Sequence, residues 1–282
     1  MNHLWTLLRT TFSAWSDHEA PRLGAALAFY AVLSLEPLVI LAIAILGLFF
    51  SQGAARDQLL GQVQGIAGLQ GAEAVKAMIE HGQKSASSTL GSVLGVITLF
   101  FGASGFFGEL HAALNKMGNV KADTQGLWTT IRDRFFSFGM VLASGFLLLL
   151  LLLASSALEA LGRSSQGLVD VSPFTLHIID LAISFGVTSS LFALIYRYVP
   201  AKRLSWRTVW IGGAMTAVLF TIGKFLIGLY LGKAGVGSAY GAAGSLVAVT
   251  VWVYYSSMII LFGAEFTYVL ASAAGEPEVN HP

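Results

Sequence analysis

The chain has 282 residues, of which 55% are apolar and only 11% are charged. Soluble domains carry roughly 25% charged residues, so this composition excludes an ordinary soluble globular protein, and the high apolar content excludes a disordered chain. The net charge of +1 gives no basic field that would attract nucleic acid. Because cysteine is absent, disulfides, thiolate metal sites and cysteine nucleophiles are excluded as well.

Long stretches without acidic or basic residues recur along the chain. A helix needs about 20 apolar residues to cross a bilayer core of roughly 30 Å. Six stretches reach this length, and three of them are interrupted by a single charge each: Glu36, Asp180 and Lys224. We therefore predict an all-α polytopic membrane protein with six transmembrane helices, at residues 25–50, 90–109, 136–158, 174–198, 209–231 and 240–270.

The distribution of Lys and Arg predicts how these helices are oriented. Ten of these residues fall on the side of the two termini and five on the opposite side. Since cytoplasmic loops carry the excess of positive charge, we expect both termini in the cytoplasm.

The segments outside the six helices divide the chain into regions. Residues 1–21 are expected to form an interfacial helix with Leu4, Leu7, Leu8 and Trp15 on one face, or else a partly ordered tail. Residues 22–271 form the membrane domain, and 272–282 a C-terminal tail. On the outer side, residues 51–89 carry apolar residues at helical spacing, which predicts two short amphipathic helices separated near Gly71.

Ionisable residues at membrane depth are the candidate functional groups. Each costs about 2.5–3.5 kcal/mol to insert, so it usually faces a partner or water. Glu36 falls near the bilayer midplane, next to Pro37, which removes a backbone donor. Asp180 and Lys224 have matching depths, and so do Arg197 and Glu265, which predicts two ion pairs. Each pair suits either a transport path or a purely structural role.

Other sequence patterns point away from soluble enzymes and towards close helix packing. The six histidines show no metal-ligand spacing, and neither a phosphate-binding loop nor a nucleophile elbow is present. We therefore expect no enzyme activity, cofactor or metal, and interpret the histidines as ordinary loop or interface residues. Gly-x-x-x-Gly pairs begin at Gly91, Gly228 and Gly237. They allow helices to approach closely and also permit a homodimer.

Several runs resemble the YihY/BrkB family of bacterial inner-membrane proteins, once labelled ribonuclease BN. They are AALAFYAVLSLEP from Ala25, GASGFFGELHAALN from Gly102, YRYVP from Tyr196, and a series that ends in Gly263-Ala264-Glu265. The resemblance covers roughly residues 22–270. It implies six helices with cytoplasmic ends in the bacterial inner membrane. The motif positions, besides Lys224 and Glu265, are Pro37, Asn115, Pro200, Tyr230, Tyr240, Gly241 and Gly244.

These observations support one principal function and two alternatives. The principal hypothesis is a transporter or exporter, not driven by ATP, for a lipid-like or amphipathic substrate. Its path would be lined or braced by Glu36, Asp180, Lys224, Glu265 and Arg197. The first alternative is a structural scaffold of the envelope, and the least favoured is a membrane-bound ribonuclease, because no acidic metal cluster is evident. Membrane lipids are the expected partners, and nucleic acid is not.

Overall fold

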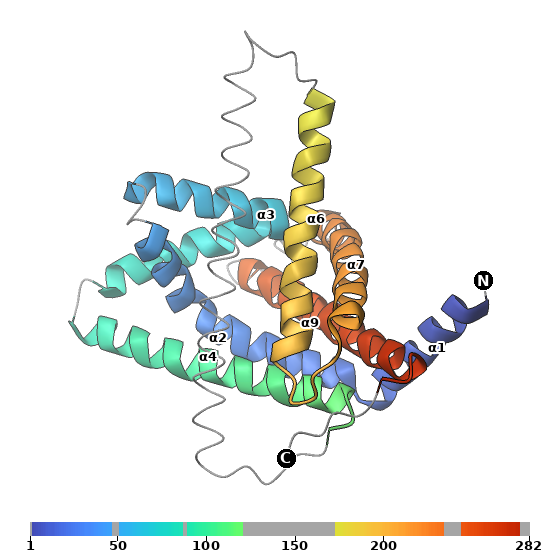
Figure 1. The fold of residues 1–282 in the computed structure, drawn as a ribbon. Coiled ribbons are helices and arrows are strands. Elements are labelled where there is room, and N and C mark those ends of the chain that lie inside the picture. Colours follow the sequence, from blue (N-terminus) through green and yellow to red (C-terminus); the bar gives the residue numbers. More distant parts are fainter. Residues whose placement is uncertain (1, 47–50, 87–88, 121–172, 234–243, 277–282) are drawn as a thin grey trace. The chain divides into compact units, whose positions relative to one another are not determined.

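The structure is a computed structural model that describes residues 2–46, 51–86, 89–120, 173–233 and 244–276 (Figure 1). Within these residues every regular element is a helix, which confirms the predicted all-α class. The predicted helix at 136–158 and the motif residues Tyr240 and Gly241 lie outside the described residues. The helices are α1 Asn2–Asp17, α2 Ala20–Leu46, α3 Gln52–Ala86, α4 Thr89–Met117, α6 Pro173–Tyr198, α7 Trp206–Lys233 and α9 Gly244–Ala273.

Four of the described helices contain segments long and apolar enough to cross a membrane. These segments are Ala20–Ile40 in α2, Leu181–Tyr198 in α6, Trp206–Tyr230 in α7 and Leu246–Ala273 in α9. Each overlaps one of the six predicted spans. The predicted span at 90–109 falls inside α4, which is a continuous helix but does not belong to these four. The count of six spans therefore stays a prediction.

The chain divides into two compact units, each made of separate chain segments. The first unit contains residues 1–18, 114–219 and 262–282, and the second contains residues 19–113 and 220–261. The boundary between residues 219 and 220 lies inside α7, and the boundary between residues 261 and 262 lies inside α9.

In the second unit, α2 and α3 pack through an apolar core. Val39 of α2 meets Val75 and Ile79 of α3, and all three side chains are buried. The helical ladder of α3 is interrupted at Gly68, where φ is 74°, a left-handed conformation that favours glycine. The outer segment thus contains two helices, separated three residues before the predicted position at Gly71. An exposed ion pair between Arg56 and Glu80, 3.1 Å long, links the two halves.

A glycine face of α4 also packs on α2 in this unit. A Cβ on Gly102 would stand 2.8 Å from Cβ of Ser34, and one on Gly105 would overlap the ring of Tyr30. Close approach of these two helices therefore depends on glycine. Beyond the predicted span, α4 continues to Met117 and buries Leu110 and Leu114.

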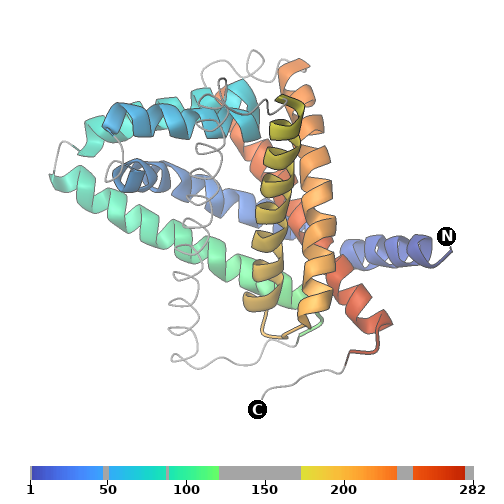
Figure 2. The same ribbon diagram turned by 45° about the horizontal axis from the view of Figure 1, so that its top comes forward.

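In the first unit, α6, the first half of α7 and the last part of α9 pack through small and hydroxyl-bearing residues. The first half of α7 lies alongside α6 in both views (Figures 1 and 2), and a Cβ on Gly213 would stand 2.6 Å from the carbonyl oxygen of Ser189. The close contact of α7 with α9 is reciprocal. Gly212 of α7 faces Thr267 of α9, and Gly263 of α9 faces Thr216 of α7.

The two threonine hydroxyls at this reciprocal contact have hydrogen-bond partners within their own helices. Thr216 Oγ1 donates to the Gly212 carbonyl over 2.7 Å, and Thr267 Oγ1 donates to the Gly263 carbonyl over 2.6 Å. The hydroxyl of Tyr196 on α6 lies 3.0 Å from Thr216 Oγ1. Hydroxyl groups bonded to their own helix cost little in an apolar medium, so the two glycines can bring the backbones together.

Candidate functional site

The N-terminal helix α1 packs against the C-terminal end of α9. Leu7 is buried, and the ring of Trp15 meets the ring of Phe262 edge-on, with centroids 6.3 Å apart. Trp5 and Phe12 are 71% and 62% exposed, so an apolar surface of α1 faces away from the contact. This is the arrangement expected of an amphipathic helix that lies at a membrane surface.

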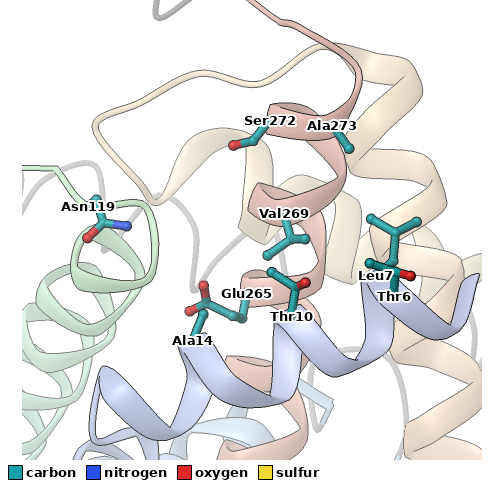
Figure 3. A pocket seen from close by; sticks show the side chains of 9 residues that line it. All are labelled: Thr6, Leu7, Thr10, Ala14, Asn119, Glu265, Val269, Ser272 and Ala273. Atoms are coloured by element: carbon teal, nitrogen blue, oxygen red, sulfur yellow. The ribbon is translucent and has the colours of Figure 1, made fainter. Parts of the chain in front are cut away.

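A cavity of about 420 Å³ lies between these two helices (Figure 3). Side chains of α1 line one wall, side chains of α9 line the other, and Asn119 from the turn after α4 stands apart at one end. Its lining combines aliphatic groups, hydroxyls, one carboxamide and one carboxylate. The lining residues are Thr6, Leu7, Thr10, Ala14, Asn119, Glu265, Val269, Ser272 and Ala273.

Glu265 supplies the carboxylate of this cavity, and its partner is a histidine. The residue is only 2% exposed. Its Oε2 atom lies 2.8 Å from Nδ1 of His18, which follows the last residue of α1. On the other side of the ring, Nε2 of His18 lies 3.2 Å from Oδ1 of Asn119, a residue with a positive φ of 51°. Three elements distant in sequence thus converge on one buried carboxylate.

The predicted ion pair between Glu265 and Arg197 is wrong. Glu265 pairs with His18, while Arg197 donates to the carbonyl oxygen of Leu204 and lies over the ring of Trp206, 5.5 Å from its centroid. The physical reason is that a side chain at the end of α6 folds over the turn that follows it. The histidines are also not all ordinary loop residues, because His18 is part of the candidate site.

The turn between α6 and α7 is held by two groups from distant segments. Asn115 at the end of α4 accepts a 2.8 Å hydrogen bond from the amide of Ala201, next to the buried Pro200. Glu276, beyond α9, accepts hydrogen bonds from the amide and the hydroxyl of Ser205, at 3.1 and 2.6 Å, and from the hydroxyl of Thr208. Asn115 and Pro200 thus have a clear structural role.

Glu276 caps the start of α7, which gives a pH-dependent prediction. Partial burial acts to raise the pKa of Glu276, but the hydrogen bonds from Ser205 and Thr208 and the charge of Arg197 outweigh it and lower that pKa. A lowered pKa contributes stability above the ordinary glutamate value of about 4.3, and this stability is lost as pH falls through the lower folded value. We expect Glu276→Gln to lower the unfolding temperature at pH 7, with the difference disappearing near pH 3. Thermal unfolding across this range measures it, and an equal difference at both pH values would contradict the assignment.

Among the described side chains, the other predicted membrane charges do not share one site with Glu265. Glu36 is half-buried on α2 and lies beside Gly82 of α3, and Lys224 is half-buried on α7. Both belong to the second unit, whereas Arg197 and Glu265 belong to the first. Asp180 falls within α6, but its side chain lies outside what the structure describes, so its pairing with Lys224 stays a prediction.

The remaining motif positions lie on continuous helices. Pro37 is inside α2 without ending it, Tyr230 is 54% exposed on α7, and Gly244 is the first residue of α9.

Sequence reasoning missed His18, Asn119 and Glu276. The depth argument used for the membrane charges could have found the first of these. His18 precedes the first predicted span and Glu265 lies near the end of the last one, so both fall toward the same predicted side of the membrane. No comparable signal marks Asn119 or Glu276, because each acts through a turn whose shape the sequence does not specify.

Comparison with known proteins gives consistent matches along the whole chain. A family model described as "Virulence factor BrkB" matches residues 11–282. A UPF0761 membrane protein of Verminephrobacter eiseniae is 30% identical over 259 residues, which cover 88% of this chain and 58% of the relative. Another UPF0761 membrane protein, of Psychromonas ingrahamii, is 29% identical, and the match covers 90% of this chain and 84% of the relative. The putative ribonuclease-like protein YfkH of Bacillus subtilis is 25% identical, with 98% of each chain covered. No solved structure matches significantly.

Proposed function

This chain belongs to the BrkB family, whose members include UPF0761 membrane proteins, and from this premise we propose a transporter for a lipid-like or amphipathic substrate. Transport would not be driven by ATP. The proposal places the protein in the bacterial inner membrane as a multi-pass protein, with both termini in the cytoplasm and membrane lipids as its partners.

The cavity between α1 and α9 is the observation that carries this proposal. Its volume of about 420 Å³ falls within the range of small-molecule sites. Leu7 and Val269 offer apolar surface, while Thr10, Ser272 and Glu265 offer polar groups. A molecule with an apolar chain and a polar head matches such a lining. The exposed Trp5 and Phe12 on α1 would hold this site at the membrane surface, where amphiphiles collect.

The burial of Glu265 favours transport over a purely structural role. A buried ion pair often stabilises a protein no more than well-packed apolar residues of similar size would. A scaffold therefore gains little from a carboxylate that is 2% exposed beside a cavity. In a transporter, the same carboxylate can bind a substrate group or a proton.

Flux into liposomes tests the proposal directly. The purified protein is reconstituted without ATP, and the entry of fluorescent cationic, anionic and neutral amphiphiles is compared with that of protein-free liposomes. We expect at least one class to cross faster in the presence of the protein. If none does, the transport proposal fails and the scaffold alternative takes its place.

We also propose that the chain is not a ribonuclease, although one Bacillus relative carries a ribonuclease-like name. A metal-dependent nuclease needs metal ligands together with phosphate contacts. In the described part of the chain no group of three or more His, Asp or Glu residues has the geometry to hold a metal ion. We expect the purified protein to leave a fluorogenic RNA intact with Mg²⁺ or Mn²⁺ added. Cleavage that co-purifies with the protein would overturn this expectation.

A further inference from the structure

We propose that the cavity between α1 and α9 binds the ammonium head of a cationic amphiphile at Glu265, and that this binding expels the proton that Glu265 and His18 share. The inference rests on the proposed function and deepens it by naming the substrate class and the coupling ion. It follows from three features of the site: the charge of its lining, the hydrogen bonds of His18, and the burial of Glu265.

The lining of the cavity selects for positive charge. Among the described residues that line the cavity, Glu265 is the one that is ionisable, and the remaining polar groups are hydroxyls and the carboxamide of Asn119. The aliphatic surface of Leu7 and Val269 lies beside these groups in the same cavity (Figure 3). An ammonium group would gain an ion pair with the carboxylate, while its alkyl chain would cover the aliphatic surface. An anionic head would be repelled by Glu265.

His18 already shares a proton with this carboxyl group. Its two ring nitrogens lie 2.8 Å from Oε2 of Glu265 and 3.2 Å from Oδ1 of Asn119. With Asn119 in this orientation, the N–H at Nε2 donates to Oδ1. The hydrogen bond between Nδ1 and Oε2 then needs one further proton, which the pair holds either as imidazolium with carboxylate or as imidazole with carboxylic acid.

An incoming ammonium group and the shared proton would compete for the same buried carboxyl group. Two positive charges beside one carboxylate at low exposure leave a net like-charge repulsion, which favours loss of the proton. The bond that holds this proton, to Nδ1 or to Oε2, breaks, the proton passes to water, and the ammonium group forms the new ion pair with Glu265. One positive charge enters and one leaves, so the exchange is electroneutral.

Among the described residues, two other titratable groups lie next to this pair, and neither is a cation. Asp17, which precedes His18, is exposed and acidic. Tyr268 on α9 is a phenol that lies close enough to interact with the charge of Glu265. The proton that leaves is accordingly assigned to the Glu265–His18 pair.

Calorimetry with the full chain in nanodiscs tests the inference. Decyltrimethylammonium is the probe, because its permanent charge means that any proton released comes from the protein. Titrations at pH 6 in buffers with different ionisation enthalpies give the number of protons released for each ligand bound. We expect about one proton for each ligand bound to the wild type, since the Glu265–His18 pair holds one proton between its two hydrogen-bonded atoms.

Substitutions separate the two parts of the inference. Glu265→Gln should weaken binding more than tenfold, whereas His18→Gln, which keeps a donor, should bind without releasing a proton. Exposed Glu80→Gln and half-buried His111→Gln are matched controls that should behave like the wild type. Circular dichroism and size-exclusion chromatography confirm that each variant is folded.

Three results would overturn the inference: no binding of the cation, equal binding of decyl sulfate, or proton release that persists in folded His18→Gln. These outcomes are distinct from failure of the proposed function. Binding with proton release but no flux would refute transport and retain the site. Flux of an anionic or neutral amphiphile without cation binding would support transport and refute the cation site.

Discussion

Replacement of Gly212 by leucine is expected to lower the unfolding temperature of the protein by roughly 6–12 °C. A Cβ at this position would overlap the hydroxyl of Thr267, which is already committed to the carbonyl of Gly263. The larger side chain can fit only if α7 and α9 separate, and forced overpacking of this kind costs about 3 kcal/mol. Separation would also remove the matching contact of Gly263 with Thr216.

The same helix provides a matched control for this substitution. A Cβ on Gly228 of α7 would meet nothing within 4 Å. Gly228→Leu therefore adds the same side chain as Gly212→Leu, but without a clash at Cβ. It should leave the unfolding temperature near that of the wild type. Thermal unfolding in detergent, followed by tryptophan fluorescence, compares the two. If both variants unfold at the same temperature, the reciprocal contact does not hold α7 against α9.

Replacement of His18 by leucine is expected to release α1 from the end of α9. The side chain of Glu265 is 3% exposed, so loss of His18 leaves a buried carboxylate without its counter-charge. Breaking a buried pair from one side costs about 3–5 kcal/mol, and the lower value suits His18, whose side chain is 17% exposed. A cost of about 3 kcal/mol makes local opening about 100-fold more frequent.

Hydrogen exchange read by mass spectrometry measures this opening over residues 2–17. The control is Arg22→Leu, which removes an ion pair with Glu19 of almost the same length, 2.7 Å, but with side chains 70% and 54% exposed. Exposed pairs contribute little, so exchange in α1 should change less than tenfold in that variant. Equal protection of α1 in the wild type and in His18→Leu would show that the pair does not dock the helix.

The sequence predicted the helices better than it predicted their partners. Charge-free stretches locate α2, α6, α7 and α9 because the cost of burying charge in a bilayer acts on each helix separately. The glycine face of α4 was also predictable, since small residues at helical spacing allow close approach. The break in α3 moved only from Gly71 to Gly68, because several glycines in this segment can adopt a positive φ.

Pairing between helices was less predictable, since it depends on which helix ends meet. Depth matched Glu265 with Arg197, although His18 also falls toward the same predicted side of the membrane. The choice was decided by the turn after α6, which gives Arg197 the carbonyl of Leu204 and the ring of Trp206. Glu276, expected in a simple tail, instead returns to cap α7.

We propose that the cavity lined by Glu265 forms part of a transport path for an amphiphile. The most direct measurement is the initial rate of entry of a fluorescent amphiphile into liposomes that contain the wild type, Glu265→Gln or Glu80→Gln, without ATP. We expect entry in the presence of the wild type and of Glu80→Gln to be faster than into protein-free liposomes, and entry with folded Glu265→Gln to equal that into protein-free liposomes. Equal rates in the wild type and Glu265→Gln would contradict it.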